Sequence, residues 1–371
     1  MSRVLLVEPF YSGSHASWAD GLAGHSRHDV VTITHPGAFW RWRMRGSSLT
    51  LAAEAKLAVE RHGTPDVVMV SGMIDLAAWL GFSRRFLGDP PVVLYLHENQ
   101  LLYPPAPNQR ADDSLPLLNW LGMAVADEVW FNSAFQRDGL LEALPDLLGR
   151  FPDELHTPWL DEVASTCQVV PVGVCLEDVP VRVSDSIHPE VPTVLWNQRW
   201  DHDKNPGAVM AALLKLAGEG LDFKVAVAGE NTRVDPREMT EARDQLGDRV
   251  VQFGHLPRPE YVDLLGVSDV VVSAAHHEFF GIAVVEAMAA GAVPVLPTRQ
   301  SYPELVPDQF HGAALYPDGG LTGRLRDVLG DLSAWRERVA GLDVAMRRFD
   351  WRQVVDDYDD RIDALVARTC N

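Results

Sequence analysis

The chain has 371 residues, 47% of them hydrophobic, and a formal net charge of −20 at pH 7. This length is enough for two domains with buried cores and argues against one small domain. The acidic balance argues against a nonspecific polyanion binder, because phosphate contacts need positive potential. The sequence shows no run of eighteen apolar residues and no signal-peptide pattern. We therefore expect a soluble, cytoplasmic protein that does not enter a membrane.

Short runs rich in Val, Leu and Ile alternate with longer helical or loop stretches. This alternation is typical of parallel sheets with crossover helices, so the predicted fold class is α/β. In the first half, the predicted strands are Arg3–Val7, Val30–Thr34, Val67–Val70, Val92–Leu96, Glu128–Phe131 and Gln168–Val172.

A break separates this half from the next. Residues 177–192 contain three prolines and four acidic residues without helical periodicity, which predicts a linker at 181–192. The second series of predicted strands is Thr193–Trp196, Phe223–Ala228, Val250–Phe253, Val270–Ser273 and Ala292–Leu296. We predict two doubly wound, Rossmann-like domains, at 1–180 and 193–345, which face a central cleft.

The last segment is predicted to form an amphipathic helix. Apolar residues recur at steps of three and four between Trp351 and Arg368, with acidic residues among them. We expect residues 346–371 to pack back on the amino-terminal domain.

Polar clusters follow two of the first-half strands. The first strand leads into a loop with Gly13 and Ser14, which suits close approach of the backbone to a ligand, although an ordinary turn is the alternative. Val92–Leu96 runs into four polar side chains that begin with His97, and such a cluster costs free energy unless it is satisfied or functional. His97 is a candidate to bond a sugar hydroxyl or to shape the charge near a reacting carbon, whereas a solitary histidine is more often structural.

Trp40-Arg41-Trp42-Arg43-Met44-Arg45 interleaves aromatic rings with three cations. This pattern suits stacking on bases beside phosphates. The alternative is a surface loop that lays its arginine side chains over tryptophan rings. The candidate nucleic-acid contacts are Arg41, Trp42, Arg43 and Arg45.

A basic pair follows the first strand of the second half. Arg199 and Lys204 lie five residues apart in one loop, where they can clamp a diphosphate and neutralise it as it leaves. The same loop contains Asp201-His202-Asp203, a D-x-D pattern that can hold a divalent ion. So short a pattern arises easily by chance in an acidic chain, so we expect no metal site, no obligatory metal and no other cofactor.

Two glutamates eight residues apart flank a turn that opens an apolar helix. Glu278 precedes the helix and Gly281 would let the backbone approach a phosphate, with the first-turn amides and the helix dipole facing that anion. Glu286 could accept hydrogen bonds from ribose hydroxyls. The alternative is a buried helix with two incidental glutamates, but predicted strands on both sides favour a nucleotide-sugar site.

These residues resemble the retaining glycosyltransferases of the GT-B architecture, whose donor domain carries an Arg/Lys pair followed by E-x7-E. In this chain the corresponding residues are Arg199, Lys204, Glu278 and Glu286. The amino-terminal half is similar to the tRNA-queuosine mannosyltransferase family, which is a more specific resemblance over roughly residues 1–305. The motifs that carry it are Glu8, Phe10-Tyr11, Gly13-Ser14-His15, Trp40–Arg45, His97–Leu101, Tyr103-Pro104, Phe131-Asn132-Ser133, Arg199-Trp200, His202-Asp203-Lys204, His277–Gly281 and Tyr302-Pro303-Glu304.

The resemblance implies transfer of mannose from GDP-mannose, with retention, to queuosine in the anticodon of an aspartate tRNA. Its implied catalytic residues are His97, Glu278, Arg199 and Lys204. The implied donor-binding residues are Gly13, Ser14, Arg199, Lys204, Glu230, Phe280, Gly281, Ile282, Ala283 and Glu286.

Three alternatives stay open at this point. One is a retaining GT-B glycosyltransferase with a small-molecule, glycan or lipid acceptor, because the donor motif is shared across that whole group. Another is a sugar-nucleotide epimerase or phosphorylase on the same scaffold. A catalytically idle RNA-binding module is disfavoured, since the basic pair and both glutamates are present.

Overall fold

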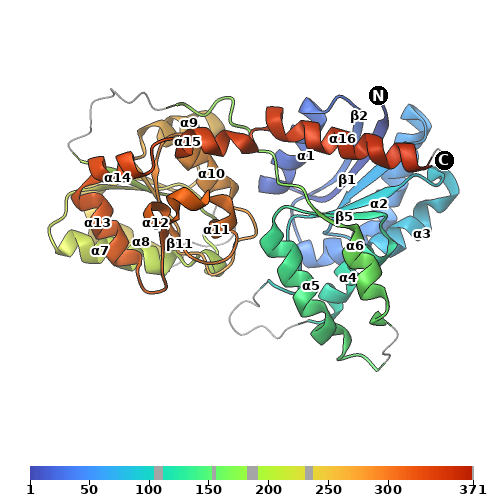
Figure 1. Ribbon diagram of the computed structural model, residues 1–371, viewed down its shortest axis with the longest axis horizontal. Helices are drawn as coiled ribbons and strands as arrows, with labels where there is room; N and C mark the ends of the chain where they lie inside the picture. The colour runs from blue at the N-terminus through green and yellow to red at the C-terminus, as the bar shows by residue number, and fades with distance from the viewer. Residues whose placement is uncertain (104–111, 153–155, 182–190, 230–236, 370–371) are drawn as a thin grey trace. The chain divides into compact units, whose positions relative to one another are not determined.

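The computed structural model describes residues 1–103, 112–152, 156–181, 191–229 and 237–369. The chain forms two compact units, one of Met1–Val174 with Trp351–Asn371 and one of Cys175–Asp350 (Figure 1). Each unit is built on a six-stranded parallel sheet.

The sheet of the first unit has the strand order β2-β1-β3-β4-β5-β6. Strands β3 and β4 are buried along their whole length, because helices cover both faces of the sheet. The strands are β1 (Arg3–Tyr11), β2 (Asp29–Pro36), β3 (Val67–Ser71), β4 (Val92–Leu96), β5 (Glu128–Phe131) and β6 (Cys167–Val169). The helices are α1 (Gly13–His25), α2 (Trp40–His62), α3 (Leu76–Leu87), α4 (Ser114–Val125), α5 (Ala134–Leu148), α6 (Trp159–Thr166) and α16 (Trp351–Thr369).

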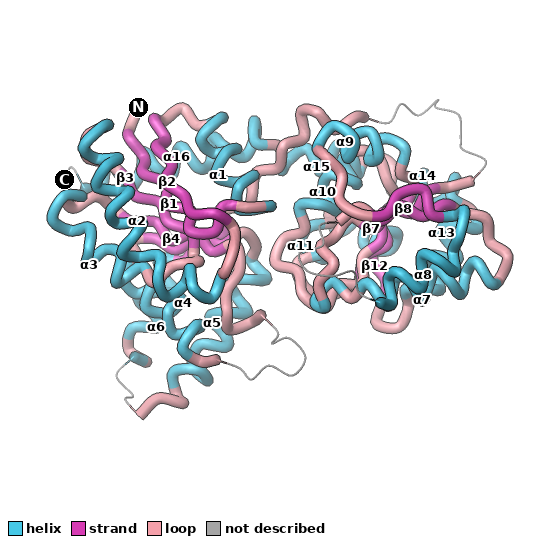
Figure 2. The backbone as a smooth tube through the Cα atoms, turned by 180° about the vertical axis from the view of Figure 1, so that it is seen from behind, coloured by secondary structure: helices cyan, strands magenta, loops and turns pink. Residues whose placement is uncertain are grey.

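Successive residues of a strand point to opposite faces of the sheet, and each face packs against a different set of helices. On one face, Leu5 and Val7 of β1 share a core with Leu51 of α2, and α3 to α6 contribute to the same core. On the other face, Trp18 of α1 stacks on Tyr95 of β4 at 4.6 Å between ring centroids. Helix α16 joins this aromatic layer, so α1 and α16 lie on the face opposite α2 (Figures 1 and 2).

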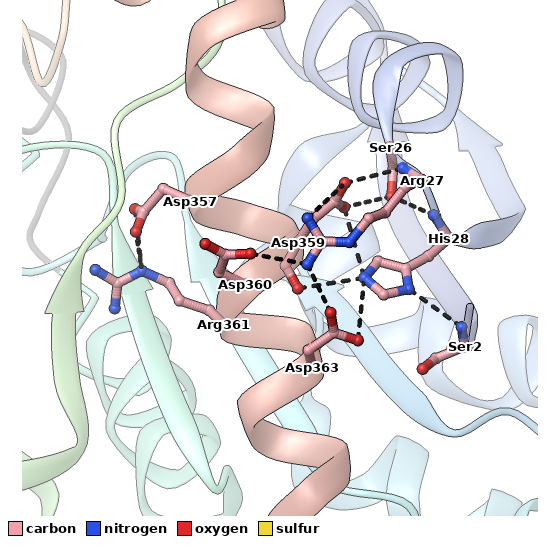
Figure 3. A network of polar contacts seen from close by, with 9 residues as sticks. All are labelled: Ser2, Ser26, Arg27, His28, Asp357, Asp359, Asp360, Arg361 and Asp363. Atoms are coloured by element: carbon pink, nitrogen blue, oxygen red, sulfur yellow. Dashed lines mark hydrogen bonds and ion pairs between the residues drawn. The ribbon is translucent and has the colours of Figure 1, made fainter.

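The acidic side of α16 is fixed to the loop between α1 and β2. The guanidinium of Arg27 donates to Asp360 at 2.8 Å and to Asp363 at 2.6 Å, and the Arg27 backbone N–H donates to Asp359 at 2.9 Å. Buried His28 lies 3.2 Å from the Asp359 carbonyl oxygen (Figure 3). The last helix of the chain is therefore an integral layer of the first unit.

The sheet of the second unit has the order β12-β11-β10-β7-β8-β9. The chain leaves β7 toward β8 and β9 and then returns to β10 on the other side, so the strand order reverses between β7 and β10. The strands are β7 (Thr193–Trp196), β8 (Lys224–Val227), β9 (Val250–Phe253), β10 (Val270–Val272), β11 (Val293–Pro297) and β12 (Leu315–Tyr316). The helices are α7 (Pro206–Gly218), α8 (Arg237–Leu246), α9 (Arg258–Val267), α10 (Ile282–Ala289), α11 (Tyr302–Leu305), α12 (His311–Ala314), α13 (Leu321–Gly330), α14 (Leu332–Arg338) and α15 (Leu342–Met346).

The boundaries of the two units differ from those expected from the sequence. Residues 175–180 and 346–350 both group with the second unit. The reason is a set of contacts within that unit: Arg347 donates to the Leu176 carbonyl oxygen at 2.5 Å, and Arg258 binds Asp178 at 2.7 Å. Most of the predicted linker, residues 182–190, lies outside the described residues.

Each predicted strand overlaps an observed one, and the α/β class is confirmed. In the part of the chain that the structure describes, no helix is both long and apolar enough to span a membrane.

Candidate functional site

The second unit brings Lys204 and Glu278 together at the point where its strand order reverses. Lys204 follows β7 in a short 3-10 helix (His202–Lys204), and Glu278 follows β10, the neighbour of β7. Because both loops leave the carboxyl edge of the sheet, the ammonium of Lys204 reaches the Glu278 carboxylate at 3.0 Å. The two side chains are only 9% and 16% exposed, so the ion pair is largely shielded from water.

Lys204 is held by two further oxygens. Its ammonium donates to the His277 carbonyl oxygen at 2.8 Å and lies 3.3 Å from Asp203. Burial, together with the nearby Lys204 charge, lowers the pKa of His277 to about 4. His277 is therefore neutral near pH 7, and Lys204 is the positive charge beside Glu278.

A hydrogen-bond network supports Glu278 from the interior. Gln198 donates from Nε2 to Glu278 at 3.4 Å and to the Tyr302 hydroxyl at 3.0 Å. Ser273 donates to the Gln198 side-chain oxygen at 3.0 Å and lies 2.7 Å from Tyr302. Sequence reasoning missed these positioning roles, although Gln198 directly precedes Arg199 and Tyr302 belongs to a motif noted above.

Gly281 forms the turn that opens α10. Its φ of +108° is a left-handed conformation that favours glycine, and an added Cβ would lie 3.0 Å from Val284. Ile282 and Ala283 begin the helix at the position expected from the sequence. Phe280 is buried, and its ring packs edge-on against Phe349 with centroids 5.2 Å apart. This contact gives Phe280 a packing role at the turn.

Glu286 lies on α10, where Arg258 and Tyr261 hold its carboxylate. Arg258 forms an ion pair with one oxygen, and the Tyr261 hydroxyl donates to the other at 3.1 Å. Burial raises the pKa of Glu286, while Arg258 and Tyr261 act in the opposite direction. Neither partner was expected from the sequence, because both come from α9, far from Glu286 along the chain.

Arg199 is half exposed, and its guanidinium lies 3.1 Å from Asp201. Each aspartate of the D-x-D pattern thus contacts a different basic side chain, since Asp203 contacts Lys204. The remaining predicted donor residue of this unit, Glu230, lies outside the described residues.

In the first unit, His97 follows β4 and lies beside His15 of α1, which in turn contacts Glu8 of β1. Its ring lies 4.2 Å from that of His15 between centroids, and His15 lies 3.2 Å from buried Glu8. Burial, with a smaller effect of His15, holds the pKa of His97 well below its usual value. Gly13 and Ser14, the predicted ligand loop, are exposed and form the first residues of α1.

The Trp40–Arg45 cluster forms the first turns of α2 and is not a loop, but one arginine does lie over a tryptophan ring, as the alternative expects. Arg41 is exposed and its guanidinium lies 4.9 Å from the Trp40 ring centre, while the Trp42 side chain is 64% exposed. Arg45 binds Asp112 at 2.6 Å, and Arg43 is half-buried. The cluster therefore presents an exposed cation and an exposed ring next to each other in the helix.

Comparison with known proteins places this fold and site in a class. Residues 182–331 match the family glycosyl transferases group 1. Sucrose-phosphate synthase from Thermosynechococcus elongatus is similar in structure over 99% of this chain and 100% of its own, with a TM-score of 0.75 and 16% sequence identity. The chain is a glycosyltransferase of the GT-B fold.

The amino-terminal unit makes the assignment specific. Residues 3–174 match the family tRNA-queuosine alpha-mannosyltransferase N-terminal. The tRNA-queuosine alpha-mannosyltransferase of Drosophila melanogaster is 33% identical over 315 residues, which cover 83% of this chain and 82% of that protein. The chain belongs to the tRNA-queuosine alpha-mannosyltransferase family.

A more distant relative shares nearly the full length. The GDP-mannose:cellobiosyl-diphosphopolyprenol alpha-mannosyltransferase of Xanthomonas campestris is 22% identical over 354 residues, covering 93% of this chain and 84% of that protein. The similarity to the Drosophila protein confirms the family that was expected from the sequence.

Proposed function

We propose that the protein transfers mannose from GDP-mannose, with retention of configuration, to queuosine in the anticodon of an aspartate tRNA. The observation that carries this proposal is the 33% identity to the Drosophila enzyme across both units, including the family-specific amino-terminal one. GDP-mannose as donor is supported by the name of the Xanthomonas relative.

On the donor side, Lys204 and Arg199 are proposed to stabilise the departing diphosphate. Lys204 is already held rigidly by Glu278 and the His277 carbonyl, so it would need little reorganisation during the reaction. Glu278 is proposed to bind the sugar, and the first-turn amides of α10 to face the phosphate. These two cations supply the compensating charge, so no metal ion is required in this scheme.

Glu286 is proposed to bind the ribose hydroxyls. Arg258 and Tyr261 orient its carboxylate, which leaves the group able to accept hydrogen bonds in a fixed direction.

On the acceptor side, the start of α2 is proposed to contact tRNA. Arg41 and Trp42 offer a cation and an exposed indole, which are the groups that bind a phosphate and stack on a base. His97 is proposed to contact the reacting region of the acceptor. Its lowered pKa keeps the imidazole neutral, so it exchanges hydrogen bonds with hydroxyls without adding charge.

Incubation of the protein with GDP-mannose and total tRNA, followed by nucleoside mass spectrometry, tests the proposal. The expected product is queuosine heavier by one hexose, and tRNA from cells grown without queuine should give none. Glu278→Gln provides a matched inactive enzyme, because it removes a charge with little change in size. Donor turnover that does not depend on tRNA would favour a small-molecule, glycan or lipid acceptor.

A further inference from the structure

The outer side of α2 carries large apolar side chains where a surface helix usually carries polar ones. Phe39 is 80% exposed, Trp42 64% and Leu49 61%. Together with Gly46 they recur at steps of three and four residues, which is the spacing of one face of a helix. Met44 and the other buried residues of α2 face the core instead. Neighbouring exposed apolar side chains, in contrast to scattered ones, mark an interaction site.

Gly46 lets the indole of Trp42 lie flat on α2. A Cβ added at Gly46 would meet three atoms of the six-membered ring, Cζ2 at 2.5 Å, Cε2 at 2.6 Å and Cη2 at 2.9 Å. Such similar distances to three consecutive ring atoms place that point over the ring face and not beyond the ring edge. One face of the indole is therefore covered by the helix backbone, and the exposed area of the side chain belongs to the opposite face and the edges.

The residues at both rings depart from the choice that favours helix stability. Gly46 lies inside α2 without a positive φ, so the backbone does not need glycine there, and glycine inside a helix is less stable than alanine. Phe39 has a left-handed φ of 55°, which suits glycine or asparagine better, and it offers no capping side chain. Each departure serves an exposed aromatic ring, so the start of α2 favours binding at a cost in stability.

The charges near these rings favour an anionic partner that also has flat, uncharged faces. Residues 40–53 contain three arginines, of which Arg45 is paired with Asp112, and no acidic residue, in a chain with a net charge of −20. RNA combines phosphates with bases, and every base presents a π face on which an aromatic ring can stack. Inside a duplex both faces of a base are covered by neighbouring bases, so an unpaired base is the one that fits.

We propose that Phe39 and Trp42 form an aromatic platform on which unpaired bases of the RNA acceptor stack, and that Gly46 is a positioning residue which seats the Trp42 indole. This inference rests on the proposed function for the RNA acceptor. The platform favours a single-stranded loop over a duplex of equal charge, since the loop offers uncovered base faces.

Binding of the anticodon stem-loop RNA in the absence of donor measures the platform separately from catalysis. Trp42→Leu keeps an apolar side chain but removes the π face. Affinity should fall roughly 5- to 100-fold for the stem-loop, and hardly at all for a blunt duplex with the same number of phosphates. Trp42→Phe keeps an aromatic face and should retain most of the affinity. Trp159→Leu makes the same substitution at a half-exposed tryptophan of α6 and is the matched control, which should bind like the parent.

Gly46→Ala and Phe39→Asn test the two departures from helix stability. The Cβ added at Gly46 displaces the exposed indole, and asparagine suits the left-handed cap. The thermal midpoint of each variant should therefore equal or exceed that of the parent, while affinity for the stem-loop falls at least about threefold. If these residues were only structural, both variants would leave stem-loop affinity unchanged.

Abasic sites placed one by one in the loop identify the base that stacks on Trp42. At that position the abasic site should weaken binding to the wild type but not to Trp42→Leu, since both changes remove the same contact. Losses that add at every position, unchanged affinity in the platform variants, or self-association of the free protein that Trp42→Leu abolishes would each overturn the platform. A wild-type protein that neither binds nor modifies tRNA would refute the proposed function itself, and the platform with it.

Discussion

Replacing Lys204 with Met tests whether this side chain stabilises the folded donor site or only contacts the phosphates of the donor. Lys204 is buried and neutralises both Glu278 and Asp203. Neither carboxylate oxygen of Asp203 has a hydrogen-bond partner among the described residues, so the ammonium is its nearest compensation. Breaking a buried ion pair by removing one partner costs about 3–5 kcal/mol, because an uncompensated charge stays inside. For a unit of this size, that loss lowers the thermal midpoint by roughly 6–20 °C.

The assay combines calorimetry of the thermal midpoint with turnover of GDP-mannose in the presence of tRNA. Arg199→Met is the matched control, because the Arg199 side chain is half exposed and should cost at most about 1 kcal/mol while still reducing turnover. The double variant Lys204→Met with Glu278→Gln also removes one of the two carboxylates left uncompensated by the loss of Lys204. It should therefore regain part of the lost thermal stability but none of the turnover. A Lys204→Met protein that melts at the parent's temperature would refute the reasoning.

Burial raises the pKa of Glu286. KM for GDP-mannose should therefore fall as the pH rises past this raised pKa and the carboxylate ionises. Arg258→Gln removes a nearby cation that opposes the shift, so the fall in a KM-against-pH profile should move to higher pH, and an unmoved profile would contradict the role of Arg258. Turnover should survive EDTA, since Arg199 and Lys204 provide the positive charge; loss of activity that magnesium restores would require Asp201 and Asp203 to be metal ligands. Arg41→Ala should flatten the dependence of tRNA affinity on log salt by about one unit without weakening GDP-mannose binding, whereas an unchanged slope in a folded variant would remove α2 from the interface.

The strands could be predicted because each buried parallel strand is a short apolar run between polar turns. β12 was missed because its two residues, Leu315 and Tyr316, are too few to form such a run and pair only at the sheet edge with β11. The sequence also gave no sign of where α2 begins. Phe39 at its N-cap has a left-handed φ of 55°, and the first turn has neither a capping side chain nor an acidic residue.

The donor residues could be predicted only in part. Lys204 and Glu278 follow strands that the alternation pattern locates, and parallel topology brings the ends of such strands together. The contact of Glu286 with Arg258 depends instead on how α9 packs beside α10, which no local pattern encodes. The pairing of Glu8 with His15 was within reach, since both residues stood in one motif. What the sequence lacked was the burial of Glu8, whose carboxylate lies beside His15 and is shielded from water.

A chain with a net charge of −20 can still present a surface suited to tRNA, because potential is local. Residues 40–53 of α2 contain three arginines and no acidic residue. The acidic residues of α16 belong to the opposite face of the sheet, where Asp359, Asp360 and Asp363 are engaged by Arg27. Charges separated by more than the Debye length, about 8 Å at physiological salt, are largely screened from each other, and a sheet with a helix layer on each side exceeds that distance. The acidic residues of α16 therefore do not cancel the charge of the arginines at the start of α2, of which Arg45 is paired with Asp112, and the acidity of the whole chain does not argue against tRNA binding there.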